Sequence, residues 1–132
     1  MKLSMRYGLV GIFALGVLSL VHWSRKSQYD GPAAADFLIG VLPNLAAAIA
    51  IPFVLLSIWS EQRPVTTYRA ARQTFFLLTL FAGLGLIAWE FVQRSSRTLV
   101  FDLYDMGATI LGLGAGWLLF ILLTPRGVAK KA

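Results

Sequence analysis

The chain has 132 residues, enough for one ordinary domain, but its composition is not that of a soluble protein. Only 14% of its residues are charged, against about 25% in typical globular domains, and 58% are hydrophobic. The net charge of +6 comes from basic residues standing singly beside apolar runs, which indicates membrane orientation and argues against nucleic-acid binding. The sequence contains no cysteine, which excludes disulfides and thiolate metal sites.

Four apolar segments are long enough to cross a membrane. A spanning helix needs about 20 mostly apolar residues. The segments cover residues 7–23, 36–59, 75–93 and 104–124, with short connectors between them. We therefore predict an all-α polytopic membrane protein, folded as a single four-transmembrane-helix bundle over residues 1–132.

The first segment has a basic start at Lys2 and Arg6, as a signal peptide would. It ends in VHWSRKS, which lacks a small-x-small cleavage pattern, so we expect a retained helix. The second segment carries Pro43, Asn44 and Pro52. A proline removes a backbone donor and kinks a helix, and in a membrane the freed carbonyl must find another partner. Two interpretations stay open: a cavity beside Asn44, or a simple bend.

The third and fourth segments meet in a polar stretch. Glu90, Gln93 and Arg94 are spaced to share one helix face, and an ionisable group inside an apolar run usually faces the bundle interior. The short connector makes the two helices antiparallel neighbours, so their polar ends should meet. We predict a polar pocket at that end of the bundle, formed by Asn44, Glu90, Gln93, Arg94, Arg97, Asp102, Asp105 and Thr109.

Some of these residues also fit purely structural roles, which are alternatives to a place in the pocket. Asp102 and Asp105 are placed to cap the fourth helix, where the helix dipole favours carboxylates. Arg94 and Arg97 are placed as flanking charges that reach the lipid headgroups. Gly112 and Gly116, four residues apart, favour close approach of two helices, within the chain or between copies. We favour contact within the chain, because four helices already need partners.

Orientation follows from the distribution of positive charge. Eight of the 12 lysines and arginines flank the N-terminus, the second connector and the C-terminus, while four lie on the opposite side. Because loops rich in Lys and Arg remain in the cytoplasm, we expect both termini to be cytoplasmic and the polar pocket to face outward.

The polar stretch follows a recognisable pattern: Glu90-x-x-Gln93, Arg97-Thr98, Phe101-Asp102-x-x-Asp105, Thr109 and Gly112. It resembles the signature of the VanZ-like family of small bacterial integral membrane proteins over the C-terminal part of the chain. Thr109 stands where that family commonly has asparagine. The resemblance implies a multi-pass protein of the bacterial inner membrane with a role in the cell envelope. The family's namesake is associated with resistance to the glycopeptide teicoplanin.

Three functions are compatible with these residues. We favour a pocket that binds a lipid headgroup or an envelope precursor, with membrane lipids or a glycopeptide-related ligand as partners. One alternative is an intramembrane enzyme in which Glu90 is the base and carboxylates hold Mg²⁺. Two aspartates three apart are a weak metal signal, so we expect neither metal nor cofactor. The other alternative is a small oligomeric transporter, although conduction needs polar groups through the full depth of the membrane.

Overall fold

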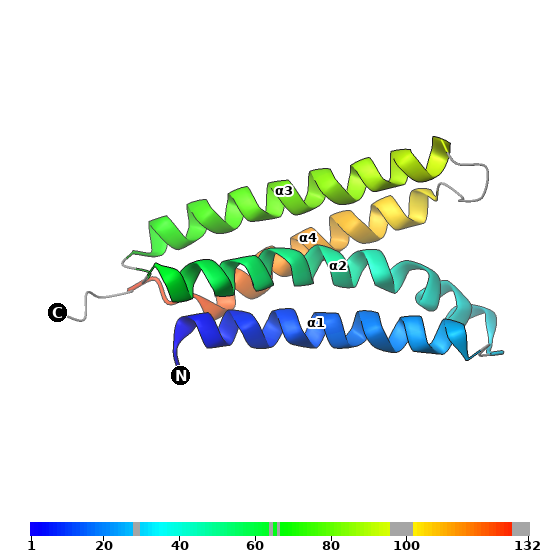
Figure 1. The fold of residues 1–132 in the computed structure, drawn as a ribbon, viewed down its shortest axis with the longest axis horizontal. Helices are drawn as coiled ribbons and strands as arrows, with labels where there is room; N and C mark the ends of the chain where they lie inside the picture. Colours follow the sequence, from blue (N-terminus) through cyan, green and yellow to red (C-terminus); the bar gives the residue numbers. More distant parts are fainter. Residues whose placement is uncertain (28–29, 64, 66, 96–101, 128–132) are drawn as a thin grey trace.

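A computed structural model describes residues 1–27, 30–63, 65, 67–95 and 102–127, and the described chain forms four α-helices (Figure 1). They are α1 (Leu3–Lys26), α2 (Ala33–Gln62), α3 (Tyr68–Ser95) and α4 (Leu103–Leu123). Each helix is long and apolar enough to cross a membrane. The described chain is therefore an all-α, multi-pass four-helix bundle, which confirms the predicted fold class.

The helices extend beyond the apolar segments that predicted them. The largest difference is at the start of α3, which begins at Tyr68 and not at Phe75. The intervening residues include alanine, arginine and glutamine, which favour helix but are not counted as apolar. At its other end α4 stops at Leu123, one residue early, because Pro125 disfavours helical backbone at Thr124.

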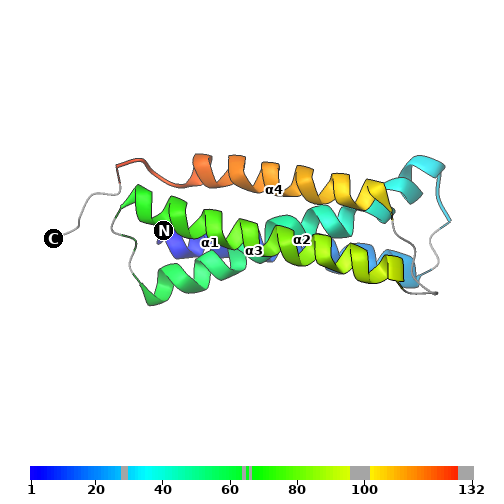
Figure 2. The same cartoon turned by 90° about the horizontal axis from the view of Figure 1, so that it is seen from above.

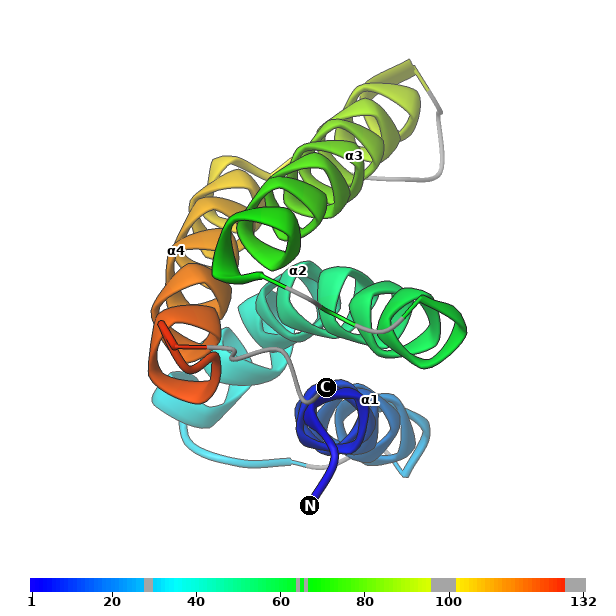
Figure 3. The same cartoon turned by 90° about the vertical axis from the view of Figure 1, so that its left-hand side faces the viewer.

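The helix α2 is central, since it packs against each of the other three helices. Viewed along the bundle, α1 lies below α2, α4 lies to its left and α3 lies above it (Figure 3). Two glycines allow the closest approaches. A Cβ atom on Gly112 of α4 would lie 2.6 Å from the Leu45 carbonyl oxygen of α2, and one on Gly11 of α1 would lie 3.1 Å from the Val54 amide nitrogen. The Gly112 contact is thus within the chain, as predicted.

The two ends of the bundle differ in charge. The start of α1, the end of α2, the start of α3 and the end of α4 lie together at one end (Figures 1 and 2). We call this the basic end; among described residues it carries Lys2, Arg6, Arg63, Arg69, Arg72 and Arg126. The opposite end, here the acidic end, has five described acids, Asp30, Asp36, Glu90, Asp102 and Asp105, against three described cations, Arg25, Lys26 and Arg94.

A cluster of four aromatic rings fills the interior toward the basic end, and each helix contributes one. Tyr7, Phe53, Phe75 and Phe120 are each at most 1% exposed. The rings of Phe75 and Phe120 are stacked with centroids 4.5 Å apart. The Tyr7 hydroxyl is hydrogen-bonded to the buried Thr124 hydroxyl at 2.8 Å, so its polar atom is satisfied inside the bundle. We call these four residues the aromatic cluster.

Candidate functional site

The site begins with a bend in α2, visible in the cyan part of the helix in Figure 1. Pro43 has no N–H group, so the carbonyl of Ile39 loses its normal helical donor. The Arg25 guanidinium of α1 replaces it: Nη2 donates to the Ile39 oxygen at 2.7 Å and to the Gly40 oxygen at 3.1 Å. The predicted need of this carbonyl for another hydrogen-bond donor is therefore met by Arg25.

Beside the bend, α2, α3 and α4 each contribute one polar residue to the same place. The Asn44 amide donates through Nδ2 to Glu90 Oε1 at 3.1 Å. The same amide also interacts with the Asp105 carboxylate. We call Asn44, Glu90 and Asp105 the polar cluster. Its members are far apart in sequence. They meet at the acidic end because α2 and α4 begin there and α3 ends there (Figure 1).

Glu90 is the most constrained member of the polar cluster. Its side chain is only 1% exposed, and its second oxygen, Oε2, has no hydrogen-bond partner among the described residues. Asp105 and Asp102 lie close enough to interact with the carboxylate electrostatically, and the Asp102 backbone N–H also interacts with it. A buried carboxylate without a full set of partners is costly. A proton, a cation or a hydrogen-bond donor from a ligand would complete this site.

Asp102 takes the structural role that competed with the pocket. It is the N-cap of α4, and its side chain accepts a hydrogen bond from the Tyr104 backbone N–H at 2.8 Å. Asp105 lies in the first turn of α4, where the helix dipole stabilises a carboxylate, and it is half-buried. Asp105 is therefore the acid of α4 that interacts with Asn44 and Glu90 without serving as the helix cap.

The other predicted pocket residues occupy several positions. Thr109 is buried, but its hydroxyl donates to the Asp105 carbonyl of its own helix at 3.0 Å. Gln93 is half-buried and Arg94 exposed, one turn beyond Glu90 on α3. Arg97 lies outside the described residues. The site brought together by described residues is thus smaller than the predicted one.

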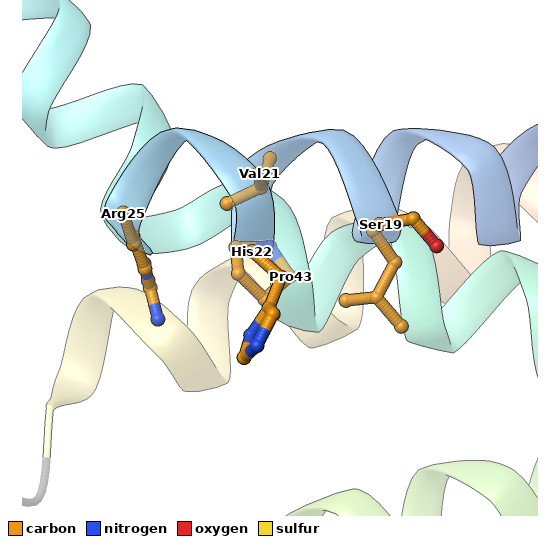
Figure 4. A pocket seen from close by; sticks show the side chains of 6 residues that line it. Ser19, Val21, His22, Arg25 and Pro43 are labelled. Atoms are coloured by element: carbon orange, nitrogen blue, oxygen red, sulfur yellow. The ribbon is translucent and has the colours of Figure 1, made fainter. Parts of the chain in front are cut away.

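A groove of about 440 Å³ adjoins the α2 bend. Its lining residues come from α1 and α2: Leu18, Ser19, Val21, His22, Arg25 and Pro43. The side chains of His22 and Arg25 project the same way from α1, toward the side on which Pro43 lies (Figure 4). Arg25 also interacts electrostatically with Asp105. It therefore links this basic groove, which we call the α1–α2 groove, to the acidic polar cluster.

Within the described residues, no three His, Cys, Asp or Glu side chains are grouped so that they could hold a metal ion. Comparison with protein-family models, with curated proteins and with solved structures finds no match. The functional interpretation therefore depends on the polar cluster and the α1–α2 groove.

Proposed function

We propose that the chain is a VanZ-like protein of the bacterial inner membrane, with both termini in the cytoplasm, that binds an amine-bearing headgroup of a lipid or envelope precursor at its polar cluster. One observation carries this proposal. Glu90 is buried at the acidic end with one carboxylate oxygen bound by Asn44 and the other without a partner among described residues. A ligand donor is the natural complement of that second oxygen.

The chemistry of the polar cluster favours an ammonium group. An ammonium has three donors and no acceptor, so it suits a site with two carboxylates, Glu90 and Asp105. Hydrogen bonds between ionised partners are about twice as strong as neutral ones. The half-buried Asp105 offers the contact nearest to water, and the cap formed by Asp102 holds the first turn of α4 in place.

The adjoining α1–α2 groove favours a phosphate in the same ligand. Arg25 and His22 line the groove, and a guanidinium is well suited to bind phosphate. Arg25 uses one nitrogen for the α2 carbonyls, while a guanidinium carries five N–H donors in all. A headgroup with both an amine and a phosphate, such as phosphoethanolamine, therefore matches the acidic cluster and the basic groove together.

A conduction path through a single copy is a weaker proposal. The aromatic cluster fills the interior toward the basic end with four side chains, each at most 1% exposed. Conduction requires polar groups or water along the whole path. The described charged residues instead gather at the two ends of the bundle, so binding at one end fits the arrangement better than transport through the bundle.

Native mass spectrometry of the detergent-solubilised chain tests the proposal. The chain is mixed with equal amounts of phosphatidylethanolamine, phosphatidylcholine and phosphatidylglycerol. We expect phosphatidylethanolamine to be retained in preference to phosphatidylcholine, and its affinity to fall by about ten- to a hundredfold in Asp105→Asn, as for a lost hydrogen bond to a charged group. Asp36→Asn is the matched control, because Asp36 is an exposed carboxylate at the same end. Equal retention of phosphatidylethanolamine and phosphatidylcholine, or equal loss in both variants, would contradict the proposal.

Glu90→Gln separates function from folding. Glutamine keeps an oxygen for the Asn44 amide and removes the charge, so we expect normal membrane insertion with weakened phosphatidylethanolamine retention. Insertion is measured by protease protection and retention by the same mass spectra. Loss of stable expression in Glu90→Gln would make Glu90 a structural residue and remove the main support for the site.

A further inference from the structure

A second groove lies between α3 and α4, away from the polar cluster. Its wider part, about 520 Å³, is lined by Arg72, Gln73, Phe76, Leu77 and Trp117. Its narrower part, about 230 Å³, is lined by Phe76, Thr79, Leu80, Gly83, Leu84, Ile87 and Leu113. Both parts share Phe76 and therefore adjoin each other along α3, and we call them together the α3–α4 groove.

The α3–α4 groove has the length of a lipid tail. Arg72, Phe76, Gly83 and Ile87 are spaced along one face of α3, so the groove follows the helix axis. At 1.5 Å per residue, Arg72 and Ile87 are about 22 Å apart along the helix. One leaflet of a hydrocarbon core about 30 Å thick is about 15 Å deep. The groove therefore spans the tail region of one leaflet.

Polarity changes along the groove. Thr79 is the one polar side chain among the described residues that line the narrow part, and its hydroxyl oxygen is buried without a hydrogen-bond partner among them. The wide part has Arg72 and Gln73 at the basic end. The groove thus has an apolar narrow part and a cationic mouth. A phospholipid has the matching arrangement, with an apolar tail and a phosphate at one end of it.

The positive charge at the mouth is not neutralised by the described residues. No described carboxylate pairs with the exposed Arg72, and Arg69 adds a second cation one turn earlier. Glu61 is the carboxylate at the basic end, and it is bound instead by Lys2 at 3.3 Å and by Ser4 at 2.5 Å. An anionic ligand would therefore be attracted to this mouth in preference to a neutral one.

We propose that the α3–α4 groove binds one anionic phospholipid, with a tail along α3 between Phe76 and Ile87 and its phosphate at Arg72 and Gln73. A guanidinium binds a phosphate through paired hydrogen bonds, and a flanking arginine naturally reaches the headgroup level. This site is independent of the proposed amine-binding function, since it is lined by other residues, its mouth lies at the other end of the bundle, and that mouth carries the opposite charge.

Trp117 provides a probe inside the groove. A variant that keeps Trp117 as its sole tryptophan, with Trp23, Trp59 and Trp89 replaced by phenylalanine, is reconstituted in phosphatidylcholine bilayers. Brominated phosphatidylglycerol or brominated phosphatidylcholine is then added as a quencher at low mole fraction. We expect brominated phosphatidylglycerol to quench Trp117 at a mole fraction about fivefold lower, the effect of one arginine near a membrane surface.

Two arginine variants separate a site from general surface charge. Arg72→Gln should abolish the preference for phosphatidylglycerol. Arg63→Gln removes the same charge at the same end but outside the groove lining, and should preserve it. Equal quenching by both lipids, or equal loss of preference in both variants, would overturn the proposal. Quenching that weakens as more protein is added per lipid would assign the groove to a second copy of the chain and would also overturn it.

Native mass spectrometry gives an independent reading on the chain with all four tryptophans. We expect a retained phosphatidylglycerol molecule that Arg72→Gln loses and Asp105→Asn keeps. Loss in Asp105→Asn instead would place the bound lipid at the acidic end and overturn the α3–α4 assignment. This measurement does not depend on the folding of the single-tryptophan variant.

Discussion

Replacing Gly112 by alanine tests the contact between α4 and α2 directly. A Cβ atom there would lie 2.6 Å from the Leu45 carbonyl oxygen and 2.8 Å from the Ala48 Cβ. Neither atom is the end of a flexible side chain, so the clash can be relieved only by moving one helix away from the other. Overpacking of this kind typically costs about 1–3 kcal/mol.

Gly114 is the matched control, because a Cβ atom there meets nothing within 4 Å. Both substitutions lie inside α4 and gain similar helix propensity, about 1 kcal/mol. The difference between Gly112→Ala and Gly114→Ala therefore isolates the packing cost. Gly83→Ala provides an intermediate case, since its Cβ would meet only the end of the flexible Leu113 side chain, with Cδ1 at 2.9 Å. That methyl group can rotate away.

The assay is reversible unfolding in mixed micelles with increasing sodium dodecyl sulfate, followed by circular dichroism. We expect Gly112→Ala to be less stable than Gly114→Ala by about 1–3 kcal/mol, with Gly83→Ala between them. A surface substitution usually changes the free energy of unfolding by no more than about 0.5 kcal/mol. If the free energies of unfolding of Gly112→Ala and Gly114→Ala differ by less than that, the close approach of α4 to α2 is refuted.

Three further substitutions are measured by the same unfolding assay. Arg25→Ala should cost about 1–3 kcal/mol because it leaves the Ile39 carbonyl at the bend without a donor; in a Pro43→Ala background, where the backbone regains an N–H, the cost should fall, and an unchanged cost would contradict this role for Arg25. Tyr7→Phe should cost about 0.5–1.5 kcal/mol because it removes the buried bond to Thr124; no change would place that hydrogen bond outside the folded core. Asp102→Ala should cost about 1 kcal/mol through loss of the α4 cap, and a neutral result would indicate that water replaces the cap fully.

The sequence by itself determined the four helices and their antiparallel order. A lipid environment requires every backbone group in a spanning segment to be bonded internally, so a long apolar run is almost necessarily a helix. It also identified Glu90, because an ionisable group inside such a run is costly unless it faces other polar groups. Helix ends were predicted less well, as at Tyr68, because polar helix formers extend a helix without raising its hydropathy.

Only the tertiary structure decided which polar groups meet. The spacing of Gly112 and Gly116 indicated a close approach, but its partner, α2, depends on the packing of the whole bundle. Thr109 had a pattern suited to the pocket, yet a threonine in a helix can bond its own backbone, and here it does. The bond from Arg25 to the bend in α2 required the two helices to pack in one particular register. Hydropathy reports how each segment interacts with the solvent, whereas the contacts between segments depend on their relative rotation and depth, which one sequence without its packed structure does not specify.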